Sequence, residues 1–520
     1  MLVSARMRFV VCALTLIAAV RLAFAQPGEP AEPPPIDDGS GSGAGSALNA
    51  LPPVVQPPPP PIAVPLVTLA EPPPPPPPPK SESWKGFRFG SYGRLIAGTD
   101  LRGGKPESAN IVAHGPRIVE PSYLELEFSY GFQTKRGLQI RPVITLAFNG
   151  TLFHDTGKFD AQPALRNMFV DAQVTKTLTA WVGSRMYRGD DIYLFDYWPL
   201  DDQNTVGGGL MFRKSEAEDH GDAVELAAHA GVNRLQTPFQ FQEVEVANPQ
   251  QGATTVVQLN RQRMIVSGTA AYLLDGGPGH LSLKGKLHGE LHALPSGTRK
   301  RDDGSLQALP NDSGFLIGAE VSAFGLGGEP EHRRHLNGYV RYAKGLAAFD
   351  ELAPPTSFGT DLKTNRASEL TFGLAGNWDH ALGNVMLGVL SRRFVDADPD
   401  SVDHDDGWEY ALDVRPLARV VPDVFVGADI SYQARFPRGL NPTTQRAEDP
   451  AVFQIAPMLV YSPMGPSAYD RPQIRLVYRA AHRNSAALDE YVPDDMRHEH
   501  TWTHFLGVQA EWWFNSSTYR

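Results

Sequence analysis

The chain has 520 residues, of which 20 % are charged and 9 % aromatic, and its formal net charge is −11. This acidic excess argues against a nucleic-acid partner, because such a partner requires a basic surface that neutralises its phosphates. A helical membrane protein is also excluded. It would need repeated apolar runs of about 20 residues, whereas the single long apolar run lies at the N-terminus.

Residues 1–25 have the pattern of a secretory signal peptide. Arg6 and Arg8 precede an apolar stretch over residues 9–20, and residues 23–25 read Ala-Phe-Ala, an expected cleavage site. A buried N-terminal helix is the alternative interpretation. Because the sole cysteine, Cys12, lies in this segment, the exported chain is predicted to lack disulfides and thiolate metal sites.

Residues 26–83 are predicted to form a disordered, proline-rich linker in the periplasm. Proline runs occupy residues 57–61 and 72–79, and residues 39–45 consist largely of glycine and serine. Such a composition buries no core and favours polyproline II and coil, with a reach of about 100 Å or more. One interpretation is a plain spacer, and the other is a tether to the cell wall or to an envelope protein.

From residue 84 to residue 520 the chain is predicted to be all-β. Short segments alternate apolar and polar side chains between breaks rich in Gly, Asp, Asn and Pro, which is the period of a half-buried strand. In residues 122–130, for example, Leu124 and Glu125 fall on opposite faces. The segment lengths match the about 9–11 residues with which a strand crosses a bilayer.

The connections between the predicted strands alternate in length. Tight turns are expected at residues 133–136, 176–177, 275–280 and 379–382, and long connections near residues 100–120, 149–164, 188–205, 233–254, 294–313, 347–366, 397–406, 435–450 and 483–500. Long loops on one rim and short turns on the other are typical of outer-membrane barrels, whose closure removes the sheet edges that hydrocarbon excludes. We therefore predict an antiparallel transmembrane β-barrel of about 18 strands with long extracellular loops, in a bacterial outer membrane.

Four sequence blocks resemble the maltoporin-like carbohydrate porins over about residues 87–514. They are FGSYGRLIAG (residues 89–98), SYLELEF (122–128), LRNMFVDAQVTKTLTAWVGSRMYRGDDIYLFDYW (165–198) and DRPQIRLVY followed by FLGVQAEWWF (470–478 and 505–514). The resemblance implies a passive, homotrimeric sugar channel surrounded by outer-membrane lipid. In that family a row of aromatic rings, flanked by charged side chains, guides an oligosaccharide through the pore.

The physical basis of such a row is the shape of a sugar. A pyranose ring offers apolar C–H faces to aromatic rings and a rim of hydroxyl groups to charged side chains. The substrate-binding positions that the resemblance implies are Tyr92, Arg94, Arg117, Tyr123, Glu125, Phe159, Arg166, Arg188, Asp191, Asp196, Trp198, Tyr469 and Trp513. Of these, Asp191, Asp196 and Trp198 belong to the third long loop, which is expected to fold inward and narrow the pore.

The sequence departs from the family pattern at several of these positions. The loop arginine of the family falls on Gly189, with Arg188 one place earlier. For the aromatic residue of the second long loop, Phe159 is the first choice and Phe153 the alternative. The last aromatic position of the family reads Leu336, and Tyr339 lies nearby with the parity of the lumen face.

Strand parity gives a separate reason to place these aromatic residues in the lumen. Tyr92 shares a face with Arg94, Trp513 shares a face with Glu511, and Tyr469 is expected to share a face of the penultimate strand with Arg475. The alternative is an aromatic girdle on the lipid-facing side. Trp502, Trp512 and Phe514 fit that alternative by parity.

No motif in the chain predicts an enzyme, a cofactor or a metal site. A nucleophile elbow, a phosphate loop and a metalloprotease helix motif are not found. His498, His500 and His504 are interpreted as loop histidines, and the acidic run at residues 396–407 as a surface loop that lacks calcium-loop spacing.

The competing functions are a general or anion-selective porin and an outer-membrane enzyme. The first is favoured if lumen arginines such as Arg88, Arg94, Arg471, Arg475 and Arg479 dominate the pore. The second, a phospholipase for example, needs a Ser/His pair on the lipid-facing wall, and the sequence does not present a convincing one.

Overall fold

The computed structural model describes residues 85–516 except 151, 154–156, 158–160, 216–220, 278, 328–332 and 399–403. The predicted signal peptide over residues 1–25 and the predicted linker over residues 26–83 lie outside the described residues. Phe159, one of the candidate aromatic residues, also lies outside them.

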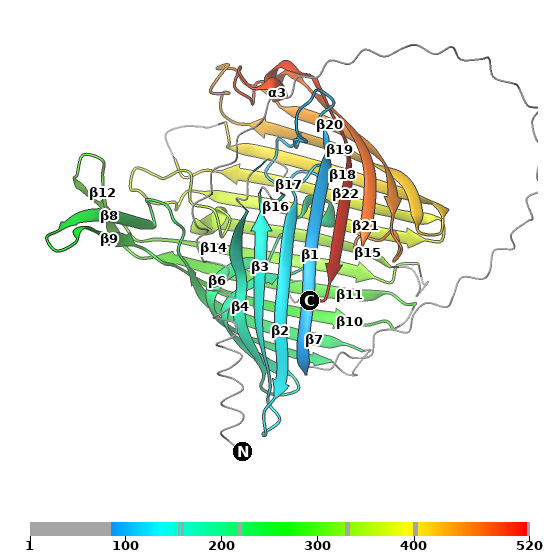
Figure 1. The fold of residues 1–520 in the computed structure, drawn as a ribbon, viewed down its shortest axis with the longest axis horizontal. Coiled ribbons are helices and arrows are strands. Elements are labelled where there is room, and N and C mark those ends of the chain that lie inside the picture. Colours follow the sequence, from blue (N-terminus) through cyan, green and yellow to red (C-terminus); the bar gives the residue numbers. More distant parts are fainter. Residues whose placement is uncertain are drawn as a thin grey trace, which may run out of the picture. The chain divides into compact units, whose positions relative to one another are not determined.

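The described chain forms a closed antiparallel β-barrel of 18 strands (Figure 1). The sheet closes because β1 pairs with both β2 and β22. Its strands are β1 (Gly86–Thr99), β2 (Tyr123–Gln133), β3 (Gln139–Asn149), β4 (Gln162–Gln173), β5 (Leu178–Arg188), β6 (Asp202–Ser215), β7 (Ala223–Asn233), β10 (Arg263–Leu274), β11 (Ser282–Leu294), β14 (Asp312–Phe324), β15 (Arg334–Gly345), β16 (Ser368–His380), β17 (Gly383–Val395), β18 (Gly407–Val421), β19 (Val424–Pro437), β20 (Ala451–Tyr461), β21 (Gln473–Arg483) and β22 (Trp502–Phe514). The predicted fold class is confirmed.

The connections alternate between a long-loop rim and a short-turn rim, as predicted. Residues 381–382 and 422–423 are tight turns, whereas residues 100–122 form a long connection on the opposite rim. Two long connections contain hairpins of their own (Figure 1). The remaining elements are β8 (Phe241–Asn248), β9 (Gly252–Asn260), β12 (Gly297–Lys300), β13 (Leu306–Leu309), η2 (Tyr193–Phe195), η3 (Leu346–Ala348), α2 (Ser485–Leu488) and α3 (Met496–Glu499).

The helices found in the described part of the chain are short. Among these residues, no helix is both long enough and apolar enough to cross a membrane.

Side chains alternate between the lumen and the outer face of the barrel. In β21, Arg475 and Arg479 are buried in the lumen, whereas Ile474 and Leu476 are exposed on the outer face. A strand in a membrane barrel has this pattern because lipid surrounds its outer face. Trp502 and Phe514, assigned to the girdle by parity, are exposed in the same way.

Two long connections fold back into the barrel and fill part of its interior. In the connection over residues 189–201, Ile192, Leu194 and Phe195 are almost fully buried. In the connection over residues 100–122, the backbone N–H of Arg117 donates to the carbonyl of Leu194 at 2.9 Å. The inward-folding third loop is therefore present, and the first long loop supports it.

Glycines on the inner wall make room for this loop. A Cβ at Gly373 of β16 would lie 2.7 Å from Ile192 Cδ1. A Cβ at Gly388 of β17 would lie 3.3 Å from atoms of Ile192, Leu194 and Phe195. The loop packs this closely because the wall has no side chains at these two points.

Gly388→Leu is expected to push the loop away from β17 and toward the open lumen, because overpacking a tight contact costs about 1–3 kcal/mol. Single-channel conductance should fall. Gly285→Leu is the matched control, because Gly285 faces outward on β11 and a Cβ there meets no heavy atom within 4 Å. Equal conductance in the two variants would contradict this account of the loop.

Candidate functional site

Two large cavities, with volumes of about 560 and 540 Å³, lie in the lumen formed by the described residues. The first, here the short-turn chamber, reaches Arg213 and Ala223 near the short-turn rim. The second, the long-loop chamber, reaches Asn149 and Gln162 beside the connection over residues 150–161. The residues that line both chambers, here called the constriction, are Met186, Arg188, Asp196 and Trp198.

Three aromatic residues, here called the aromatic row, lie on adjacent strands at the seam of the barrel: Tyr92 on β1, Tyr123 on β2 and Trp513 on β22. Tyr92 is the register partner of Trp513 on β22 and of Glu125 on β2, so these side chains share the lumen face. Tyr92 and Trp513 line the short-turn chamber, and Tyr123 lines the long-loop chamber. Because the Tyr92 and Tyr123 ring centroids are 6.0 Å apart, the row runs from one chamber to the other.

Charged groups flank the Tyr123 ring on two sides. The guanidinium carbons of Arg94 and Arg166 each lie 5.4 Å from its centroid. The Tyr123 hydroxyl donates to Glu125 Oε1 at 2.6 Å, and Arg166 Nη1 lies 2.6 Å from the same oxygen. Sequence reasoning named all four residues, and the structure brings them together.

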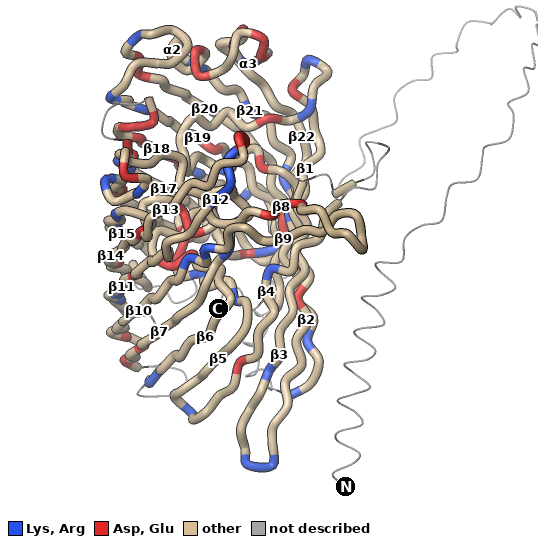
Figure 2. The backbone as a smooth tube through the Cα atoms, turned by 90° about the vertical axis from the view of Figure 1, so that its left-hand side faces the viewer, with Lys and Arg blue, Asp and Glu red and all other residues tan. Residues whose placement is uncertain are grey.

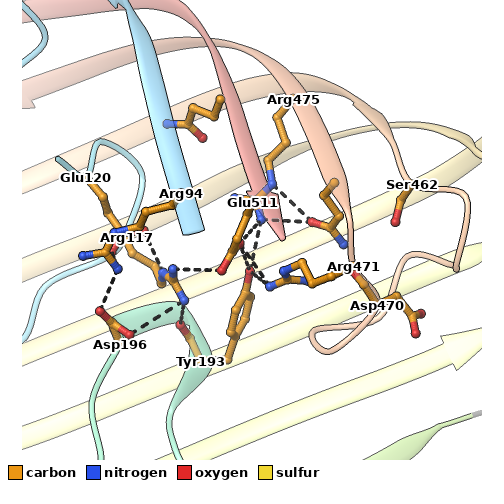
Figure 3. Close-up of polar contacts among 12 residues, drawn as sticks. Arg94, Arg117, Glu120, Tyr193, Asp196, Ser462, Asp470, Arg471, Arg475 and Glu511 are labelled. Carbon is orange, nitrogen blue, oxygen red and sulfur yellow. Dashed lines mark hydrogen bonds and ion pairs between the residues drawn. The ribbon is translucent and has the colours of Figure 1, made fainter. Parts of the chain in front are cut away.

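Glu511 joins the wall to the inward loops (Figure 3). Its carboxylate, with 5 % of the residue exposed, forms ion pairs with Arg117 at 3.2 Å, Arg471 at 3.1 Å and Arg475 at 2.7 Å. It also accepts a hydrogen bond from the Tyr193 hydroxyl at 3.1 Å. Loss of this carboxylate would remove the acidic partner that Arg471 and Arg475 share, and an uncompensated buried charge is strongly destabilising.

Asp196 places a second carboxylate at the constriction. It follows η2 in the left-handed conformation, with φ of 51°, which Asp tolerates better than most residues. Arg94 Nη1 lies 3.0 Å from Asp196 Oδ2 (Figure 3). Burial alone would raise the pKa of Asp196, but Arg117 and Arg94 outweigh it and hold the pKa below its ordinary value.

Arg188 supplies the guanidinium at the constriction. It stacks on Trp198, with its carbon 3.6 Å from the ring centroid, and pairs with Asp202 at 3.0 Å. Gly189, where the family pattern has arginine, has no room for a side chain. A Cβ there would lie 1.8 Å from Asp201 Oδ1.

Tyr469 lies in the connection before β21 and not in the strand, which corrects the sequence expectation. The strand begins only at Gln473. From this connection Tyr469 still lines the short-turn chamber and donates to Asp191 Oδ1 at 3.0 Å. Burial raises the pKa of Asp191 to about 6, against the lowering effect of this hydrogen bond.

The aromatic positions at which the sequence departs from the family pattern differ in where the structure places them. Phe153, the described alternative to Phe159, is 50 % exposed and lines neither chamber. Leu336 faces outward with 42 % exposure. Tyr339 faces inward but is buried, and its hydroxyl donates to the Asp191 carbonyl at 3.2 Å, so it supports the loop.

The remaining predicted residues are described by the chamber that they line. Arg117 and Asp191 line the short-turn chamber, and Arg166 lines the long-loop chamber. Arg94 and Glu125 line neither chamber, but each contacts residues that do.

Several lumen residues were missed by sequence reasoning. Lys284 and Lys286 on β11 pair with Asp190 at 2.5 Å and Asp201 at 2.8 Å. Parity within that strand would have found both lysines. Tyr193 has no comparable signal, because it lies in a loop that follows no repeating pattern.

The described part of the chain contains no group of three or more His, Cys, Asp or Glu side chains that could hold a metal ion. Of the three histidines interpreted as loop residues, His498 lies in α3 of the last long connection and contacts the Leu488 carbonyl. His504 lies instead in β22, which corrects that interpretation, and contacts the Tyr478 hydroxyl.

Comparison with known proteins shows a family match. A family model described as LamB porin matches residues 87–514. No curated protein matches the chain.

Several solved structures resemble the barrel distantly. The outer membrane channel DcaP of Acinetobacter baumannii is 8 % identical, with 82 % of this chain and 98 % of that chain covered and a TM-score of 0.39. OccAB1 of the same species is 12 % identical, with 82 % and 95 % covered and a TM-score of 0.39. Wzi of Escherichia coli, a carbohydrate-binding β-barrel, is 9 % identical, with 81 % and 83 % covered and a TM-score of 0.35. At these TM-scores the likeness carries no argument about function.

Asp191 is expected to give the lumen a pH-dependent charge. Because its pKa is about 6, it is ionised above that pH and neutral below it. Cation selectivity, measured by reversal potential, should therefore fall between about pH 7.5 and about pH 5. In Asp191→Asn the part of the fall centred near pH 6 should disappear.

The control is Asp495→Asn in the connection after β21. Arg497 donates to this carboxylate and lowers its pKa to about 2, so its charge is constant over the same range. An Asp191→Asn profile identical to that of the wild type would remove Asp191 as the titrating group.

Proposed function

We propose, from the premise that the chain belongs to the LamB porin family and is an outer-membrane β-barrel porin, that it is a channel for facilitated diffusion of oligosaccharides. The observation that carries the proposal is the aromatic row Tyr92, Tyr123 and Trp513. This row spans both chambers and is flanked by paired charges. A barrel wall needs no such rings on its lumen face, because its girdle lies on the outside.

The chemistry of the row suits a neutral sugar. Aromatic faces offer a pyranose an apolar surface. Arg94, Arg166 and Glu125 surround the Tyr123 ring with charged donors and acceptors that can exchange hydrogen bonds with hydroxyl groups. Several weak sites in series allow a sugar to enter without being trapped.

The main alternative is a general or anion-selective porin. Arg94, Arg471 and Arg475 would support it if they were free, but each forms an ion pair with a carboxylate. Basic and acidic positions are also interspersed around the barrel (Figure 2). Reversal potentials in a salt gradient separate the two functions, because an anion-selective porin would strongly prefer chloride.

The proposal extends to the cellular setting. The channel is a homotrimer surrounded by outer-membrane lipid. Residues 1–25 direct its export, and residues 26–83 form the periplasmic spacer or tether.

Tyr123→Ala is expected to weaken the block of ion current by maltodextrins about three- to tenfold, because one stacking surface is lost. Single-channel recording with a maltodextrin series measures the effect. Barrel assembly should be unchanged.

Trp502→Ala is the matched control, because Trp502 is an exposed aromatic residue on the outer face. Maltodextrins should block the ion current of this variant with the wild-type affinity. Unchanged sugar affinity in Tyr123→Ala would remove this residue from the row, and absence of block by any sugar would overturn the proposed function.

A further inference from the structure

The Arg185 side chain lies among three aromatic rings on the lumen wall, Phe169, Trp181 and Tyr187, which are here called the cradle. Its guanidinium carbon lies 4.9 Å from the Phe169 centroid, 5.0 Å from that of Tyr187 and 5.5 Å from that of Trp181. Trp181 in turn stacks on His229, with centroids 5.4 Å apart and planes at 13°. These contacts fix the guanidinium in place without neutralising its charge.

The polar groups of this cradle have no partner within the described chain. Among the residues that the structure describes, nothing accepts a hydrogen bond or forms an ion pair with the Arg185 guanidinium, and the Tyr187 hydroxyl has no hydrogen-bond partner either. Both side chains are partly exposed and line the short-turn chamber. Five N–H donors and a phenolic hydroxyl are therefore available to a ligand.

Three other cations of the same chamber differ in this respect. Lys284 pairs with Asp190 at 2.5 Å, Lys286 with Asp201 at 2.8 Å, and Arg471 with Glu511 at 3.1 Å. Since each of these charges is already balanced, an anion in the chamber gains less from them than from Arg185.

Nearby carboxylates weaken the attraction of an anion to Arg185 but do not remove it. Asp171, which contributes to the field at Arg185, is paired with Arg141 at 2.6 Å. Glu225 lines the same chamber and opposes an anion there. Its register partner on β6 is Arg213, which lines the chamber close to the short-turn rim.

We propose that the short-turn chamber binds acidic saccharides, such as uronic-acid oligosaccharides, with a sugar carboxylate on Arg185 and Tyr187. The planar guanidinium matches a carboxylate with two parallel hydrogen bonds. Tyr92 and Trp513 line the same chamber, so one unit of an oligosaccharide can stack there while the carboxylate of another unit lies on the cradle. This inference rests on the proposed function and names the class of sugar.

The test compares trigalacturonate with maltotriose, which has the same number of sugar units and no charge. Each is titrated against the wild-type channel and Arg185→Gln in planar bilayers, and the dissociation constant for current block is measured. Loss of a charge-assisted, two-point contact should weaken trigalacturonate block about tenfold or more. Maltotriose block should change less than about twofold.

Two further variants keep the result interpretable. Tyr187→Phe removes only the hydroxyl and should weaken trigalacturonate block about threefold or more, which provides a test even if Arg185→Gln does not assemble. Arg213→Gln removes the same charge from the same chamber at its rim. It should change trigalacturonate block less than about threefold, because solvent and salt screen an exposed charge.

The outcomes distinguish this inference from the proposed function. Selective weakening of trigalacturonate block in Arg185→Gln or Tyr187→Phe supports the acidic-sugar site. Equal weakening of both sugars, or an Arg213→Gln effect as large as that of Arg185→Gln, overturns it. Block by maltotriose without block by trigalacturonate overturns the inference alone, and block by neither sugar overturns the proposed function as well.

Discussion

The pairing of the first strand with both the second and the last is the constraint on which the remaining structure depends. Hydrocarbon offers backbone N–H and carbonyl groups no partners, so a strand edge cannot face it. Pairing of β1 with β2 and β22 removes the last edges of the sheet. Closure also fixes which side chains meet at the seam, and this is how Tyr92, Glu125 and Trp513 come to share one part of the lumen.

The inward loops convert this closed barrel into a channel with two compartments. Glu511 supplies a buried negative charge to which Arg117, Arg471 and Arg475 converge from different segments. The opposite side of the loop packs against wall glycines such as Gly388. Polar contacts on one side and close apolar packing on the other hold the loop, which narrows the lumen between the two chambers.

Much of this arrangement could be predicted from the sequence, because strand parity repeats every two residues. Parity placed Trp513 in the lumen and Trp502 outside, as the structure has them. It failed at Tyr469, because the chain leaves the strand period there and runs through a connection. Positions in non-repeating loops, such as Tyr193, depend on tertiary contacts that no local pattern encodes. That Arg185 has no counter-ion among the described residues could not be predicted either, because it depends on neighbours in three dimensions.

The seam has a consequence for when the channel matures during biogenesis. Tyr92 comes from the first strand of the barrel and Trp513 from the last, and they become neighbours only when β1 and β22 pair. As long as β1 and β22 are unpaired, nothing holds these two rings side by side, however complete the other strands are. The surface that these two rings form together therefore requires the closing strand pair, and a chain truncated before β22 would lack it whatever else it retained.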